Sequence, residues 1–260
     1  MTPKTRKLVN AMLLCGLAGG AQGALASTTP YFYNGAAYPS YLTGTIRADT
    51  NNSYTSASNS GYERTLNVGA GGFKMAPDLN GNGTMQLTEA SQSLVTWCVD
   101  IFHTVQSAKY TDGNLSNLSS YLQTKMSASN LNTSDLKSLV NQRYTTVQQQ
   151  ANNTYSAAFQ LALWEIVNET SGTYNLNSGS FKASGFSTTA ISTAQTWLAL
   201  NGNNTGNFKV SYLFDFNAEA NPNTQNLITM SPVPLPAALP LFLSGLGILG
   251  FALRRRKEES

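Results

Sequence analysis

The N-terminal part of the chain, to about residue 107, alternates short apolar and β-branched segments with clusters of glycine, asparagine and serine. Segments 38–46, 65–73 and 94–102 have the composition and length of strands. The last of these, LVTWCVDIF, is apolar at nearly every position, which predicts a central strand. Segments 208–216 and 226–230 predict that the chain returns to strand at the end of the domain.

The middle of the chain has helical periodicity instead. Apolar residues recur three and four positions apart over residues 115–126. Ser134 is expected to cap a second helix, a third is expected over residues 156–169, and a fourth over residues 188–200. The predicted fold class is therefore α+β: a single β-rich domain over residues 27–230 with an inserted set of helices.

The first 26 residues have the pattern of a secretory signal peptide. Basic residues at positions 4, 6 and 7 precede an apolar stretch, and small residues lead to Ala26, after which cleavage is expected. Cys15 would leave with this peptide, and Leu14 argues against the alternative of a lipoprotein acylated at Cys15. Cys98 would then be the only cysteine of the exported protein.

The C-terminal segment 237–253 is a run of 17 uncharged, mostly apolar residues that ends at Arg254, Arg255 and Arg256. At about 1.5 Å per helical residue the run spans roughly 25 Å, enough for a short transmembrane helix. The arginine cluster predicts that the tail stays in the cytoplasm and that everything upstream lies outside.

Residues 231–260 also resemble the PEP-CTERM sorting signals of proteins exported by diderm bacteria, in the VPLPA variant. The motif itself comprises Val233, Pro234, Leu235, Pro236 and Ala237. The resemblance implies an exosortase-type processing enzyme and a precursor tethered to the inner membrane. The released protein would belong to the cell surface or the extracellular matrix of a biofilm. Leu235 stands where the commonest form has glutamate, which leaves the cleavage bond open.

The net charge of +3 comes from the two ends of the chain. The leader contributes +3 and the tail +2, so the domain between them carries −2. A domain without a basic patch is not expected to bind nucleic acid. Charged residues make up only 11% of the chain, which argues against ion-pair chemistry as the basis of its function.

A lone cysteine in an exported protein has no disulfide partner, so burial, intermolecular pairing or reactivity must account for it. Gln160 lies 62 positions after Cys98, and Trp164 lies one turn further on the same face of the predicted helix. A thiol and a carboxamide held together can expel ammonia and form an internal thioester. This bond needs proximity to form and a site that excludes water to survive. Asp100, two residues from Cys98 on the same strand face, is a candidate polar assistant.

The segments WCVD (97–100) and FQLALW (159–164) resemble the paired motifs of Cys–Gln thioester domains, the TQXA-like domains of surface adhesins. The resemblance implies that Cys98 and Gln160 are the cross-linked pair, surrounded by Trp97, Phe159 and Trp164. Phe159 departs from the threonine that precedes the glutamine in one family signature. Family members anchored by sortase belong to Gram-positive walls, so the target need not be shared.

The function that these motifs imply is covalent attachment in a single turnover. An amine or hydroxyl group of a target, on a polysaccharide or a protein, would attack the thioester. The chain would then be an adhesin and not an enzyme, and no cofactor is expected.

Two other roles for Cys98 remain open. Cys98 can be an inert core residue of a non-covalent structural protein of the surface or matrix. It can also be the nucleophile of a hydrolase whose base is the single histidine, His103. Five positions on one strand would place these two side chains on opposite faces, so only an intervening turn would bring them together. His103 is otherwise expected at the end of the strand, bonded to backbone.

Residues 78–89, DLNGNGTMQLTE, fit the spacing of an EF-hand calcium loop. Pro77 and the glycines before it exclude an entering helix, so an Asn-Gly hairpin turn is the preferred interpretation and no metal site is predicted. The glycine cluster at residues 69–72 predicts a strand bulge.

Overall fold

The computed structural model describes residues 31–50, 62–77, 94–101, 103–105, 108–125, 131–169, 172–202, 206–215 and 224–233. These residues belong to one unit of the chain, residues 27–233. The predicted signal peptide, the sorting motif from its second residue on, the apolar run 237–253 and the calcium-like loop 78–89 lie outside the described residues. No helix within the described ranges is long and apolar enough to cross a membrane.

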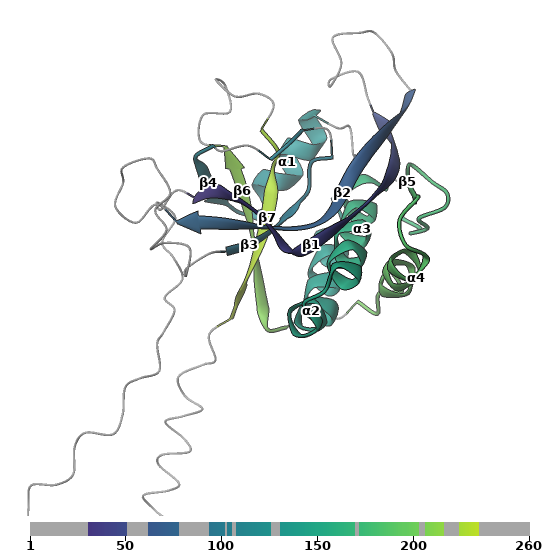
Figure 1. Ribbon diagram of the computed structural model, residues 1–260. Helices are drawn as coiled ribbons and strands as arrows, with labels where there is room; N and C mark the ends of the chain where they lie inside the picture. Colours follow the sequence, from purple (N-terminus) through teal and green to yellow (C-terminus); the bar gives the residue numbers. More distant parts are fainter. Residues whose placement is uncertain are drawn as a thin grey trace, which may run out of the picture. The chain divides into compact units, whose positions relative to one another are not determined.

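Six of the described strands close into a barrel (Figure 1). In spatial order they are β2 (Tyr62–Pro77), β3 (Leu94–Cys98), β7 (Leu227–Pro232), β6 (Phe208–Asp215), β4 (Tyr110–Gly113) and β1 (Tyr31–Thr50). Strand β1 also pairs with β2, which closes the ring, and β5 (Phe181–Ser184) extends the sheet beside β1. Neighbouring strands run antiparallel in each of these pairings.

Four helices accompany the strands in the described part of the chain: α1 (Leu115–Lys125), α2 (Thr133–Gln150), α3 (Asn153–Asn168) and α4 (Thr188–Trp197). Helix α3 packs against α2 and α4 and also against β1 and β2 (Figure 1). Helix α1 contacts β6. The expected β-rich domain with inserted helices is therefore confirmed in outline.

The starts of two helices differ from the sequence prediction. Helix α2 is capped by Asn132, whose side-chain oxygen accepts the Asp135 N–H, so the predicted cap at Ser134 is wrong. Helix α3 begins three residues before the predicted start, because the side chain of Asn152 accepts the Tyr155 N–H at 3.0 Å. Asparagine caps helices about as well as serine does, so composition alone cannot choose between neighbouring candidates.

The strand predicted over residues 94–102 is too long. Strand β3 ends at Cys98, and although the Val99 N–H still donates to the Asn226 carbonyl at 3.0 Å, the chain then turns at Ile101. Strands β4 and β5 have only four residues each and were not predicted. Both owe their pairing to neighbours that are distant in the sequence.

The bulge predicted at the glycine cluster is present, but the extra residues lie in the opposite strand. The register between β1 and β2 shifts between Tyr38 and Leu42 of β1. A Cβ on Gly71 of β2 would stand 2.7 Å from the Ser40 carbonyl oxygen. Glycine is thus required at position 71 because the bulged backbone of β1 comes too close for any side chain.

The C-terminal end of α3 holds the loop that precedes β5. Glu165 accepts the Asn175 N–H at 2.6 Å, and Glu169 accepts the Ser180 N–H at 2.9 Å. Glu165 is fully buried, and its second oxygen has no hydrogen-bond partner within the described residues. Burial raises the pKa of Glu165 to about 8; the bond from Asn175 opposes this shift and the neighbouring Glu169 adds to it. The neutral carboxyl is therefore the stable form at pH 7.

We predict that this carboxyl makes the protein less stable as the pH rises. The unfolded side chain ionises near pH 4.3, whereas the folded one stays protonated until about pH 8, so stability is lost between these values. Glu165→Gln keeps the acceptor for Asn175 but cannot ionise. Its free energy of unfolding should match that of the wild type at pH 4 and exceed it by about 4 kcal/mol at pH 8. Urea unfolding at both pH values measures this, and parallel pH profiles for the two proteins would contradict it.

Candidate functional site

The site is built around the middle of helix α3. Every residue of α3 from Ser156 to Asn168 is buried. This segment, SAAFQLALWEIVN, is mostly apolar or small, with Gln160, Glu165 and Asn168 as its larger polar residues, which is the pattern of a helix enclosed by the core. Gln160 is polar and lies in the middle of the segment. Its amide must therefore find hydrogen-bond partners inside the protein.

Those partners exist because β2 and β3 separate next to α3. The two strands pair from Met75–Leu94 to Phe73–Thr96, after which β2 continues alongside β1. At the separation, the Ser156 hydroxyl accepts the Gly72 N–H at 3.2 Å and donates to the Tyr38 carbonyl at 2.7 Å. Ser156 thereby satisfies two backbone groups on the β2 side of the gap.

Gln160 lies one helical turn further along α3 and satisfies two backbone groups of β3. The Cys98 N–H donates to Oε1 of Gln160 at 3.0 Å, and Nε2 of Gln160 donates to the Cys98 carbonyl at 2.8 Å. The carboxamide thus takes the place of a neighbouring strand beside Cys98. Both residues are buried, at 1% and 0% exposure. The structure therefore brings together the two residues that the sequence proposed as a reactive pair.

The thiol of Cys98 is free and buried, and it donates to the carbonyl of Asp100 at 3.0 Å. Burial raises the pKa of Cys98 far above its usual value, and the charge of Asp100 raises it further. The indole N–H of Trp164 partly offsets this shift, so it lies near the sulfur, but it makes no hydrogen bond of normal geometry within the described residues. Cys98 is thus a neutral thiol at pH 7 and not a standing thiolate.

Aromatic side chains pack together in this region. Trp97 packs edge-on against Phe159 with ring centroids 4.7 Å apart, and both rings contact Tyr144. Trp164 lies against Phe181. These side chains are almost completely buried. Trp97 and Phe159, the sequence neighbours of Cys98 and Gln160, are therefore buried against each other, and Trp164 packs in a second aromatic contact with Phe181; their role as a shield stays a prediction.

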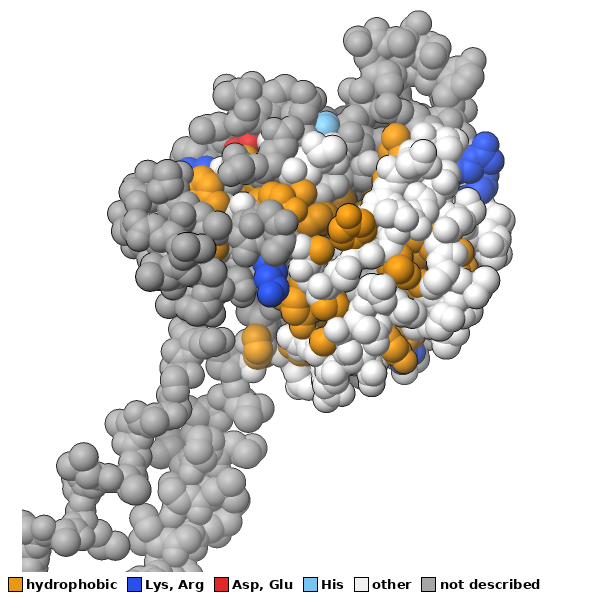
Figure 2. All heavy atoms as spheres, in the orientation of Figure 1, with side chains coloured by type: hydrophobic (Ala, Val, Ile, Leu, Met, Phe, Trp, Pro, Cys, Tyr) orange, Lys and Arg blue, Asp and Glu red, His pale blue; other side chains and the backbone are white. Residues whose placement is uncertain are grey.

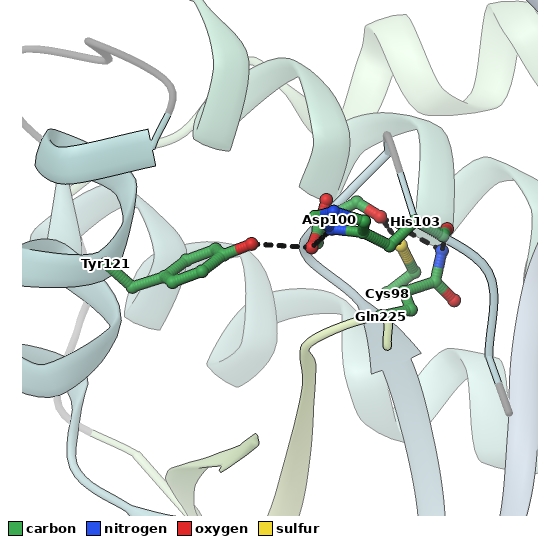
Figure 3. A network of polar contacts seen from close by, with 5 residues as sticks. All are labelled: Cys98, Asp100, His103, Tyr121 and Gln225. Atoms are coloured by element: carbon green, nitrogen blue, oxygen red, sulfur yellow. Dashed lines mark hydrogen bonds and ion pairs between the residues drawn. The ribbon is translucent and has the colours of Figure 1, made fainter. Parts of the chain in front are cut away.

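Beyond Cys98 the chain turns back and forms a polar network at the end of β3 (Figure 3). The carboxylate of Asp100 pairs with Nδ1 of His103 at 2.5 Å and accepts the Tyr121 hydroxyl at 2.7 Å. The expectation that His103 bonds to backbone is thus wrong for its ring. The argument that separated it from Cys98 fails because the strand ends at Cys98, and the intervening turn brings His103 to Asp100.

Gln225, which lies just before β7, forms hydrogen bonds to this turn. Its Nε2 donates to the carbonyls of Asp100 at 3.0 Å and of His103 at 2.8 Å, and its backbone N–H donates to Thr104. The sequence analysis missed Ser156, Tyr121 and Gln225. Ser156 had a signal, since it lies one turn before Gln160 on the same face. Gln225 had none, because its position depends on the return of a distant strand.

The described surface is poor in charge. Figure 2 shows one face of it, on which neutral polar groups and small apolar areas surround a few separate charged side chains. Within the described ranges no three histidine, cysteine, aspartate or glutamate side chains gather where they could hold a metal ion.

Comparison with known proteins adds evidence about the end of the chain. A family model of the PEP-CTERM protein-sorting motif matches residues 232–257. The chain carries a PEP-CTERM sorting motif. This motif indicates an exported protein that is sorted to the cell surface, and it implies processing by exosortase, a membrane enzyme. The VPLPA variant of the motif stays a prediction.

Two solved structures resemble the domain loosely. One is the N-terminal thioester domain of a surface protein from Clostridium perfringens, with 14% identity, a TM-score of 0.39, and coverage of 73% of this chain and 99% of that one. The other is a cysteine-to-alanine mutant of such a domain from the same organism, with 14% identity, a TM-score of 0.38, and coverage of 62% and 89%. No curated protein matches the chain in sequence.

We predict that Ser156 is needed for the separation of β2 and β3. Ser156→Ala leaves the buried Gly72 N–H and the Tyr38 carbonyl without their partner, which should lower the free energy of unfolding by about 1–3 kcal/mol. Ser192→Ala is the matched control, since its exposed hydroxyl bonds only within α4 and its loss should cost less than about 0.5 kcal/mol. Chemical denaturation compares the two, and equal losses would contradict the role given to Ser156.

Proposed function

We propose that Cys98 and Gln160 form an internal thioester through which this exported surface protein attaches covalently to a target. The observation that supports the proposal is the pair of hydrogen bonds between the Gln160 carboxamide and the Cys98 backbone. They fix the carboxamide beside the residue that carries the thiol, in a buried site. Such fixed proximity is the main requirement for an intramolecular acyl transfer.

In the proposed first step, Sγ of Cys98 attacks Cδ of Gln160. The C–S bond forms, the C–N bond breaks, and the thiol proton leaves with the amide nitrogen as ammonia. The negative charge of the tetrahedral intermediate develops on Oε1, which already accepts the Cys98 N–H at 3.0 Å. That backbone donor would act as an oxyanion hole.

In the second step, an amine or hydroxyl group of the target attacks the same carbon. A C–N or C–O bond forms, the C–S bond breaks, and Cys98 regains its thiol. The product is an amide or ester between Gln160 and the target, so each molecule reacts once and does not turn over. The aromatic surroundings of Cys98 and Gln160 favour a long lifetime for the bond, because water is kept out. The final destination, cell surface or biofilm matrix, and the class of target are parts of this proposal.

The mass of the exported protein before and after methylamine treatment tests the thioester. A thioester adds the whole amine, so the mass should rise by about 31 Da. An ordinary glutamine adds nothing. Because the two masses are measured on the same protein, any processing of the chain ends contributes equally to both and does not change their difference. Cys98 should resist alkylation in the unfolded protein before methylamine and accept it afterwards.

Cys98→Ala is the control for this experiment, since it removes the sulfur from a site that stays filled by the same aromatic residues. Its mass should not change with methylamine. A wild-type protein with an unchanged mass and an alkylatable thiol before treatment would contradict the proposal. It would favour the alternative of a non-covalent structural protein in which Gln160 only completes the hydrogen bonds of β3.

A further inference from the structure

The network beyond β3 contains an imidazole that the bond chemistry alone does not require. We propose that His103 is the proton carrier of target attachment: it takes the proton of the attacking amine or hydroxyl and delivers it to Sγ of Cys98. This inference rests on the proposed thioester and adds a catalytic residue to its second step. Asp100 and Tyr121 then serve as positioning residues.

His103 is closer to the surface than the buried pair of Cys98 and Gln160. The side chain of Asp100 is fully buried and Cys98 and Gln160 are almost or completely so, whereas the side chain of His103 is 14% exposed. Tyr121, the other side chain bonded to Asp100, is partly buried and carries only a weakly acidic hydroxyl. Among the described residues of this network, His103 is thus the side chain that has a second ring nitrogen for proton transfer and is also partly exposed to solvent.

The imidazole of His103 is oriented by a carboxylate. The Asp100 carboxylate pairs with Nδ1, which assigns proton exchange with the target to Nε2. The same carboxylate oxygen, Oδ2 of Asp100, also accepts the Tyr121 hydroxyl, which helps to fix its position. When His103 accepts a proton, the positive charge of the ring is balanced by Asp100 at its other nitrogen. A carboxylate that orients an imidazole in this way is the usual arrangement of a general base.

Hydrogen bonds hold the backbone next to both the thiol and the imidazole. The thiol donates to the Asp100 carbonyl, and Gln225 bonds the carbonyls of both Asp100 and His103 (Figure 3). The backbone at Asp100 and at His103 is therefore held in place next to the sulfur by these hydrogen bonds. A fixed geometry of this kind lowers the entropic cost of a proton transfer between the imidazole and the sulfur.

The sulfur of Cys98 is the leaving group of the second step. When the target attacks, the C–S bond breaks and the electron pair goes to sulfur. Burial disfavours a thiolate at Cys98, so the sulfur must receive a proton as it leaves. The proton balance is closed by the target itself: its N–H or O–H proton passes to Nε2 of His103 and from there to Sγ. No other reactant is needed.

Kinetics of methylamine coupling, followed by intact mass on the exported full chain, test this role. His103→Asn keeps an amide donor for Asp100 but cannot carry a proton. It should still lose ammonia and form the thioester, yet couple methylamine about 100-fold more slowly than the wild type. Thr104→Ala is the matched control on the same turn, because the Thr104 side chain is exposed and only its backbone bonds Gln225. It should couple at the wild-type rate.

Two further measurements separate proton transfer from a structural role. Imidazole added to His103→Ala should restore a large part of the lost rate, and it should not accelerate the wild type. The wild type should also couple more slowly in D₂O, a result that depends on no variant folding correctly.

The outcomes distinguish this inference from the proposal on which it rests. A wild type that never gains mass with methylamine defeats the thioester itself. A wild type that reacts, with His103→Asn within twofold of its rate, overturns the role of His103 alone. An absent isotope effect would also overturn the role of His103. A failure of imidazole to rescue His103→Ala would do the same. A His103→Asn protein that retains its ammonia would place His103 in bond formation, and would likewise overturn the assignment.

Discussion

Strand β3 loses its β2 partner after Thr96, and the backbone N–H and carbonyl of Cys98 must be satisfied in the middle of the core. The side chain of Gln160 meets this constraint by forming two hydrogen bonds where a strand would have formed them. The bonds fix the rotation and height of α3, since Ser156 one turn earlier bonds the other side of the gap. The same hydrogen bonds therefore determine both how α3 packs and where the carboxamide of Gln160 lies.

The same hydrogen bonds suit Gln160 to a structural role and to a chemical role, because both roles need the same surroundings. An amide that only completes a sheet needs to be immobile and dry, and an amide that is to react with a thiol needs the same conditions. Loss of ammonia would remove the bond from Nε2 to the Cys98 carbonyl but keep the bond to Oε1. The fold would thus pass from the unreacted to the cross-linked form with one backbone donor still in place.

The sequence predicted the parts that depend on local pattern. The periodic leucines located α1, and the apolar run with Trp97 and Cys98 located β3. The proximity of Cys98 and Gln160 was also foreseen, from their chemistry and from the order of the two motifs, whereas the bond between them stays a prediction. The end of β3 was not foreseen: the residues that directly follow Cys98 include no glycine, proline or asparagine that would mark a turn, and the turn is held by Gln225, more than 120 positions away. His103 was assigned to the wrong environment for the same reason.

A crystal structure of the exported protein tests the central claim most directly. The account predicts continuous electron density between Sγ of Cys98 and Cδ of Gln160, no density for Nε2, and Oε1 still within hydrogen-bond distance of the Cys98 N–H. An intact carboxamide with both of its hydrogen bonds to Cys98, beside a separate thiol, would contradict the account and leave Gln160 as a structural residue.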